Sequence, residues 1–151
     1  MNKETPLGSN TLSILGYLIA VAGVIGLQYQ GSLLARGSIG LSFQVIAVLL
    51  FIWARWTFGL RSFHAAATPT SGELVTNGPY RFLRHPIYAA LIYFAWAGAL
   101  TQPTIGAFGF TLLVTLGLAL RILLEERLLV VAYPDYLQYT ARTSRVIPFL
   151  L

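Results

Sequence analysis

The chain has 151 residues, of which 56% are hydrophobic and 10% are charged, with a formal net charge of +5 and a mean hydropathy of +0.71. So few charged residues cannot cover the surface of a soluble protein of this size. The composition therefore indicates a single domain embedded in a membrane. The absence of cysteine excludes disulfides, thiolate metal sites and a cysteine nucleophile. The arginines lie at the ends of apolar segments, which argues against a nucleic-acid partner and favours contact with membrane lipids.

Four apolar segments predict transmembrane helices, because a hydrocarbon core about 30 Å thick requires about 20 apolar helical residues. In chain order they are residues 11–28, 39–58, 86–101 and 103–124. The first follows a short polar start without an evident cleavage site, so we expect a retained span rather than a signal peptide. The last two are joined by a tight turn and should form an antiparallel hairpin. We therefore expect an all-α integral membrane protein with four transmembrane helices, a cytosolic pocket and a C-terminal interfacial helix.

The distribution of basic residues predicts the orientation of these spans. Four spans place both termini and the connection between the second and third spans on one side of the membrane. Nine of the ten basic residues then lie on that side: Lys3, Arg55, Arg61, Arg81, Arg84, Arg121, Arg127, Arg142 and Arg145. Only Arg36 lies on the other side. Since basic residues are enriched in cytoplasmic loops, both termini and the charged side should be cytoplasmic.

A turn followed by a helix start, at residues 74–88, carries most of the polar side chains of this side. Gly78 lies in an Asn-Gly-Pro turn, and Pro86 suits the first turn of a helix. His85 precedes a proline and is therefore disfavoured in helical geometry. The free N–H groups at this helix start favour an anion.

Two arginines and two tyrosines flank that helix start. Arg81, Arg84 and His85 surround a site for a charged or polar ligand, and Tyr80 and Tyr88 add aromatic rings and hydroxyls. An alternative interpretation is an ordinary interfacial belt, in which arginine and tyrosine anchor the ends of helices.

The C-terminal part holds a second group of polar residues. Arg121 and Glu125 are one helical turn apart and can pair, and Glu126 lies on an adjacent face. Acidic residues at a membrane boundary are costly unless they are paired or bind a ligand. Arg142 and Arg145 follow in a tyrosine-containing tail, which could alternatively be an amphipathic helix on the membrane surface. The chain has two histidines, so a histidine-rich metal site is not expected.

The order of these residues resembles a known family. The sequence Gly-Pro-Tyr-Arg-Phe-Leu-Arg-His-Pro-Ile-Tyr at residues 78–88 is similar to the signature of the isoprenylcysteine carboxyl methyltransferases and their phospholipid methyltransferase relatives. The Glu-Glu pair at residues 125–126, two tyrosines at 136 and 139 and the Arg-Val-Ile-Pro ending at 145–148 look like the C-terminal block of that family. The resemblance covers residues 74–148. Two departures, Ala90 in place of a frequent glycine and Ala-Tyr-Pro at 132–134 in place of a Phe-Gly pair, leave the shape of the substrate open.

The resemblance implies a membrane methyltransferase that uses S-adenosylmethionine. In that family the cofactor pocket lies at the cytosolic face, closed over by the C-terminal segment, and a lipophilic or lipidated substrate enters from the bilayer. Carried over onto this chain, the cofactor-binding residues are Leu74, Val75, Gly78, Tyr80, Arg81, Arg84, His85, Pro86, Tyr88 and Glu125. The candidates for orienting the acceptor or closing the pocket are Arg121, Glu126, Arg142 and Arg145.

The acceptor group remains open at this point. A carboxylate is ionised at neutral pH and needs arginines to hold it, whereas an amine needs deprotonation, in which Glu126 or a tyrosine could assist. We favour carboxylate O-methylation, with phospholipid amine N-methylation as the alternative. A nicotinamide-dependent membrane reductase and a non-enzymatic membrane scaffold are the competing functions from other classes.

Overall fold

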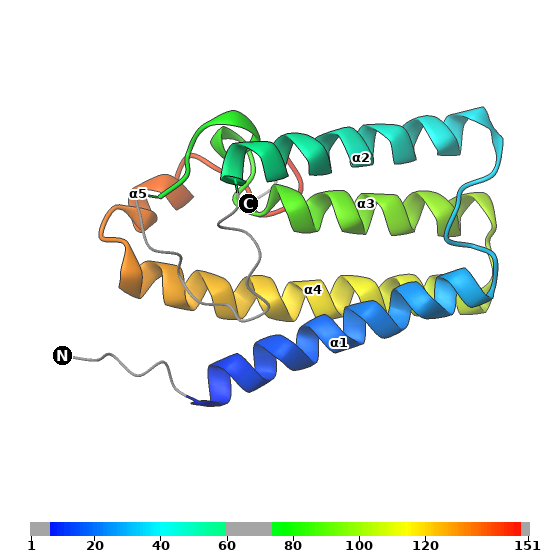
Figure 1. Cartoon of the computed structure of the whole chain (residues 1–151), viewed down its shortest axis with the longest axis horizontal. Helices are drawn as coiled ribbons and strands as arrows, with labels where there is room; N and C mark the ends of the chain where they lie inside the picture. The colour runs from blue at the N-terminus through cyan, green and yellow to red at the C-terminus, as the bar shows by residue number, and fades with distance from the viewer. Residues whose placement is uncertain (1–6, 60–73, 149–151) are drawn as a thin grey trace.

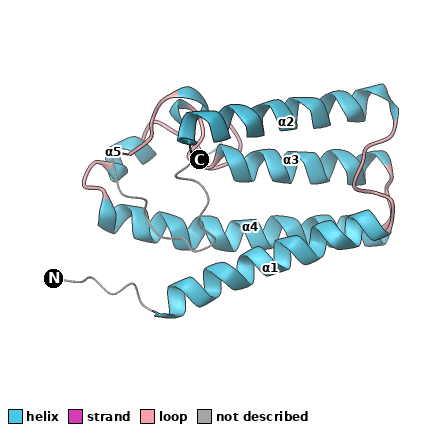
Figure 2. Cartoon of the chain, in the orientation of Figure 1, coloured by secondary structure: helices cyan, strands magenta, loops and turns pink. Residues whose placement is uncertain are grey.

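A computed structural model of the protein describes residues 7–59 and 74–148, and every regular element in this part of the chain is helical (Figures 1 and 2). The helices are α1 (Leu7–Tyr29), α2 (Gly37–Phe58), the short 3-10 helix η2 (Gly78–Arg81), α3 (Pro86–Thr101), α4 (Ile105–Ala132) and α5 (Tyr136–Thr140).

The four long helices form two antiparallel pairs. Helix α1 packs along α4, and α2 packs along α3, while α3 also contacts α4 and joins the two pairs. The start of α1, the end of α2, the start of α3 and the end of α4 lie at one end of the bundle, together with η2 and α5 (Figure 1). The fold thus gathers the polar sequence segments at one end, which we call the charged end.

Three helices are long and apolar enough to cross a membrane, namely α1 from Thr11 onward, α2 and α4. Helix α3 has 16 residues and is about 24 Å long, and its bounds are those predicted for the third span. Helix α4 covers the fourth predicted segment except for its first two residues. Helix α4 begins at Ile105, where the Thr104 side chain accepts a 3.0 Å hydrogen bond from the Ala107 N–H. It then continues past residue 124, because the residues up to Ala132 favour helix.

Small residues allow α1 and α4 to approach closely. A Cβ atom added at Gly117 would lie 2.4 Å from the Gly16 carbonyl oxygen, and one added at Gly16 would lie 2.8 Å from the Gly117 carbonyl oxygen. Such contacts are typical of apolar helices, which associate by close packing of their backbones. The contact fixes α1 against α4 one turn before Arg121.

A buried amide fastens α2 to the rest of the bundle. The Gln44 side chain accepts a 2.9 Å hydrogen bond from Ala35 N and donates to the carbonyls of Leu33 and Phe94, at 2.8 and 3.1 Å. A polar side chain inside an apolar bundle is costly unless it is hydrogen-bonded, so these bonds explain how Gln44 is tolerated there. Its role is structural.

Candidate functional site

The turn that precedes α3 is shaped by Gly78 and docks on the end of α2. Gly78 has a φ of +56°, which favours glycine, and a Cβ atom there would lie 2.5 Å from Thr57 Oγ1. The next turn places the buried ring of Tyr80 5.5 Å from the ring of Phe58. The α3 helix then starts at Pro86, which lies in its first turn, with His85 as the capping residue.

Backbone pairing holds residues 139–146, which we call the C-terminal clasp, against the segment before α3. Arg84 N donates to Ser144 O at 2.8 Å, Ser144 N donates to Phe82 O at 3.1 Å, and His85 N donates to Arg145 O at 3.1 Å. This short parallel bridge satisfies backbone groups of both segments. The clasp is therefore a fixed wall of the site in this structure.

Two tyrosine hydroxyls add to the clasp. Tyr139 donates a 2.6 Å hydrogen bond to the Tyr80 carbonyl oxygen, and Tyr93 on α3 donates to the Val146 carbonyl oxygen. Burial raises the pKa of Tyr139 to about 12. The Tyr139 hydroxyl is therefore protonated, and able to donate this bond, throughout the neutral range.

Glu126 lies at the centre of an ionic cluster beneath the clasp. Its Oε1 accepts from Arg84 Nε at 2.9 Å, its Oε2 accepts from Arg145 Nε at 2.9 Å, and His85 Nε2 lies 3.4 Å from Oε1. The side chains of Arg84 and Glu126 are only 7% and 13% exposed. Arg84 Nη1 also donates to the Thr140 carbonyl oxygen at 3.0 Å and to the Thr143 carbonyl oxygen. The cluster thus joins α4, the start of α3 and the clasp.

His85 Nε2 is buried, and its contact with Glu126 does not have the geometry of a hydrogen bond. The His85 ring stacks on that of Tyr88, with centroids 5.7 Å apart. Burying a polar nitrogen without a hydrogen bond costs free energy. The 3.4 Å contact with Glu126 is thus the polar contact that the structure gives this nitrogen.

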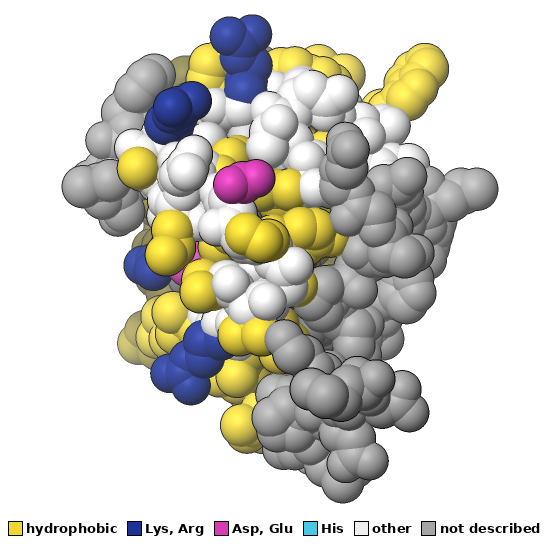
Figure 3. All heavy atoms as spheres, turned by 90° about the vertical axis from the view of Figure 1, so that its left-hand side faces the viewer, with side chains coloured by type: hydrophobic (Ala, Val, Ile, Leu, Met, Phe, Trp, Pro, Cys, Tyr) yellow, Lys and Arg dark blue, Asp and Glu magenta, His cyan; other side chains and the backbone are white. Residues whose placement is uncertain are grey.

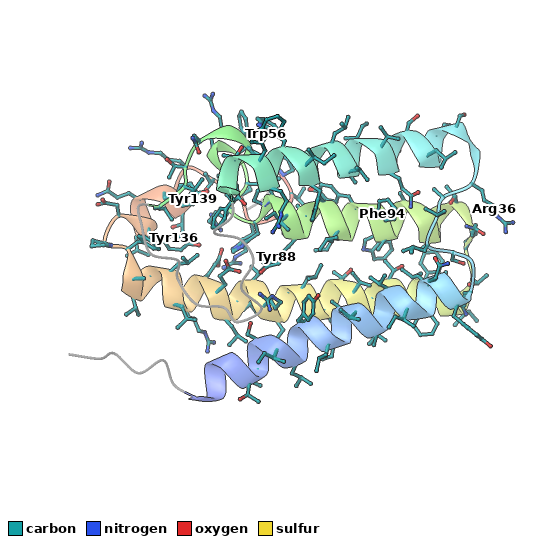
Figure 4. The ribbon with its side chains drawn as sticks, in the orientation of Figure 1. Arg36, Trp56, Tyr88, Phe94, Tyr136 and Tyr139 are labelled. Carbon is teal, nitrogen blue, oxygen red and sulfur yellow. The ribbon has the colours of Figure 1, made fainter. Side chains whose placement is uncertain are left out.

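Tyr88 links the two charged residues that the sequence predicted as a pair. Arg121 Nε donates to the Tyr88 hydroxyl at 3.2 Å, and that hydroxyl donates to Glu125 Oε2 at 2.9 Å. Arg121 and Glu125 are thus connected through a side chain of α3. Figure 4 shows Tyr88 between α3 and α4, at the end of the bundle where Tyr136 and Tyr139 also lie.

Helix α1 completes the surroundings of Arg121, which is buried. The Arg121 guanidinium carbon lies 5.7 Å from the ring centroids of both Tyr17 and Tyr88. Arg121 Nη1 also lies 3.5 Å from the Ser13 carbonyl oxygen. Sequence reasoning missed Ser13 and Tyr17, whose only signal is that both are polar and lie one helical turn apart on an apolar helix.

The remaining predicted residues lie around this centre or on the surface. Leu74 and Val75 are half-buried before η2. Arg81 and Arg142 are exposed, and the Arg81 guanidinium lies 5.1 Å from the Phe82 ring. Figure 3 looks at the charged end and shows arginine side chains at separate places among hydrophobic ones. Within the described residues no group of histidine, aspartate and glutamate could hold a metal ion.

A carboxylate and several aromatic rings meet where α3 begins. Burial, and then the nearby Glu125 carboxylate, raise the pKa of Tyr80 above its usual range. An anionic group beside tyrosine rings favours a cationic ligand, because the ring faces and the carboxylate both attract positive charge. The arginines and the free N–H groups at the start of α3 favour an anionic group close by. The site can therefore bind a ligand that carries both charges.

Two known proteins are similar to part of this chain. The chain is 34% identical over 85 residues to the cobalt-zinc-cadmium resistance protein CzcN of Cupriavidus metallidurans, covering 53% of this chain and 38% of that protein. It is 39% identical over 71 residues to methanethiol S-methyltransferase 1 of Bradyrhizobium diazoefficiens, covering 46% of this chain and 24% of that protein. The chain thus spans well under half the length of either relative. No solved structure matches it.

A family model described as phospholipid methyltransferase matches residues 35–136, which include α2, η2, α3, α4 and both carboxylates discussed above. This match covers most of the chain and confirms the resemblance seen in residues 74–148. The chain belongs to the phospholipid methyltransferase family.

Proposed function

We propose that the protein is a membrane methyltransferase that uses S-adenosylmethionine and acts on a lipophilic acceptor. The hydrogen-bonded chain Arg121–Tyr88–Glu125, which is half-buried between α3 and α4, is the observation that carries the proposal. Family membership supports methyl transfer over a nicotinamide-dependent reductase or a scaffold.

The residues at the charged end fit this cofactor. Its sulfonium and ammonium groups are cationic, and Glu125 with the rings of Tyr80 and Tyr88 offers them negative charge and aromatic faces. The unsatisfied Nε2 of His85 offers a hydrogen bond to a polar group. Leu74, Val75, Gly78, Arg81, Arg84 and Pro86 complete the set of residues that we assign to the cofactor.

The proposed chemistry asks little of the protein beyond position and exclusion of water. The bound cofactor supplies an activated methyl group, so no residue has to activate the donor. Tyr88 and Glu125 would contact the bound methyl donor. The clasp would separate the donor from water on the aqueous side. Alignment of two reactants in a shielded site can contribute several kcal/mol, on the order of 7–11, to lowering a barrier.

The ionic cluster suggests a supporting role for Glu126 and Arg145. Both oxygens of Glu126 accept hydrogen bonds from arginines, so this carboxylate is poorly suited to take a proton from an amine. We assign Glu126 and Arg145 to positioning the clasp. Glu126 is thereby set aside as a base, and an acceptor that is already ionised, such as a carboxylate, needs none.

The proposed orientation places the charged end in the cytoplasm. Among the described residues, Arg36 lies at the opposite end of the bundle (Figure 4), and the other arginines lie at or toward the charged end. Lys3 and Arg61, which the sequence also assigned to this side, are outside the described residues. Helix α3 packs beside α2 (Figure 1), so we propose that it is the fourth span although it is short.

Calorimetry of S-adenosylmethionine binding tests the proposal. The purified chain in detergent should bind the cofactor saturably, and Glu125→Gln and His85→Ala should each weaken binding about tenfold or more. Arg127→Gln, an exposed position on the same helix, is the control and should bind normally. Equal affinity in all four folded proteins would reject the assigned pocket.

A further inference from the structure

Ser13 on α1 is buried, its backbone carbonyl oxygen lies beside Arg121, and its hydroxyl has no hydrogen-bond partner. Ser13 is 0% exposed, and its Oγ finds no partner within the structure. A buried hydroxyl that makes no hydrogen bond raises the free energy of the folded protein. A bound ligand that supplied an acceptor atom would remove this cost.

The neighbour of Ser13 is a buried positive charge. Arg121 is 5% exposed, its Nη1 lies 3.5 Å from the Ser13 carbonyl oxygen, and its guanidinium is flanked by the rings of Tyr17 and Tyr88. The Gly16–Gly117 contact holds α1 in this place, since a Cβ at Gly16 would lie 3.3 Å from Arg121 Cγ. The geometry is therefore set by close packing of two helices.

The position of Arg121 along α4 places it next to the proposed cofactor residues Tyr88 and Glu125. It lies one helical turn, about 6 Å, deeper in the bundle than Glu125, and the Tyr88 hydroxyl touches both. Tyr17, one turn after Ser13, is 49% exposed on the outside of α1. A ligand at Arg121 would thus be adjacent to the cofactor residues and next to a lipid-facing ring.

We propose that α1 forms part of the acceptor site. Arg121 and the Ser13 hydroxyl bind an anionic acceptor group, a thiolate or a carboxylate, and Tyr17 packs on the apolar body of the acceptor. This inference rests on the proposed methyl transfer and specifies its substrate class. It assigns specificity to two residues of α1 that lie outside the family match at residues 35–136.

An anionic acceptor balances the reaction without a base. The acceptor's lone pair forms the new bond to the methyl carbon, while the methyl–sulfonium bond breaks and its electron pair stays on sulfur. One negative and one positive charge combine, so both products are neutral at the reacting atoms. A carboxylate is already ionised at neutral pH and loses no proton, whereas a thiol first releases its proton to solvent as it binds beside the positive charge of Arg121. An amine would arrive as an ammonium ion, which Arg121 repels.

Binding of an inert anion tests the subsite separately from turnover. Hexanesulfonate is titrated into the full chain in lipid nanodiscs with S-adenosylhomocysteine present. Ser13→Ala should raise the Kd of hexanesulfonate about 10-fold, and Tyr17→Ala should raise it to a smaller extent. Thr111→Val removes another buried, unpartnered hydroxyl three turns away, and Leu18→Ala removes a lipid-facing side chain. Both controls should bind hexanesulfonate like the parent.

Turnover of six-carbon acceptors that differ only in their reacting group shows which group the enzyme methylates. Hexanethiol, hexanoate and hexylamine are compared by kcat/KM, and at least one of the first two should exceed the amine, with a raised KM in Ser13→Ala. A higher kcat/KM for hexylamine than for the other two acceptors would overturn the inference. So would an unchanged Kd for hexanesulfonate in both Ser13→Ala and Tyr17→Ala. If S-adenosylmethionine still bound in these cases, the proposed function would stand. A parent protein that failed to bind S-adenosylmethionine would overturn the proposed function and this inference together.

Discussion

Glu126 joins three parts of the chain that are distant in sequence. Its carboxylate receives one hydrogen bond from the start of α3, through Arg84, and one from the clasp, through Arg145. Removing one partner of a largely buried ion pair typically costs about 3–5 kcal/mol, because the remaining charges are left uncompensated. The clasp should therefore depend on this one side chain.

Replacement of Glu126 by glutamine should release the clasp and leave the bundle intact. Amide exchange of residues 139–146, measured by hydrogen–deuterium exchange in detergent, should increase strongly, while exchange in α1 and α2 should stay unchanged. Arg142→Gln serves as the control, since Arg142 is exposed. Unaltered protection of residues 139–146 in Glu126→Gln would show that the backbone pairing alone holds the clasp.

Individual site residues were predictable from the sequence only where local rules apply. The turn at Gly78, the helix start at Pro86 and the proximity of Arg121 to Glu125 follow from turn chemistry and helical periodicity. The insertion of Tyr88 between those two side chains depends on how α3 packs on α4, and no spacing within one helix encodes it. The same holds for Ser13 and Tyr17, which reach Arg121 only through the α1–α4 contact.

At the scale of elements, apolar length predicted the four long helices, and the ends were less certain. The bounds of α3 agree with the prediction because Pro86 marks its start and a short polar turn ends it. Helix α4 extends to Ala132, since charged residues such as Arg127 are good helix formers once the helix leaves the apolar core.

The C-terminal segment was expected to form an interfacial helix that closes the pocket. Its helical part, α5, has five residues, and the following residues pair with the segment before α3 as the clasp. Parallel pairing between such distant segments leaves no periodic signal in the sequence. The backbone pairing of the clasp could therefore be found only in the structure.

At the scale of the whole molecule, the charge asymmetry predicts the topology. Reporters fused to the two termini should both report a cytoplasmic location, because four spans return the chain to its starting side and the basic residues favour the cytoplasm. Opposite locations would mean that α3 does not cross the membrane. In that case only the three helices of sufficient length would be spans.

We propose above that the charged end of this bundle transfers a methyl group from S-adenosylmethionine to a lipophilic acceptor. The most direct test incubates the purified full chain with methyl-deuterated cofactor and a membrane lipid extract, and follows the label by mass spectrometry. We expect a deuterated, lipid-soluble product from the parent protein. The amount of this product should fall strongly in Glu125→Gln and stay the same in Arg127→Gln. A folded parent protein that yields no labelled product, or Glu125→Gln protein that yields as much as the parent, would contradict the proposal.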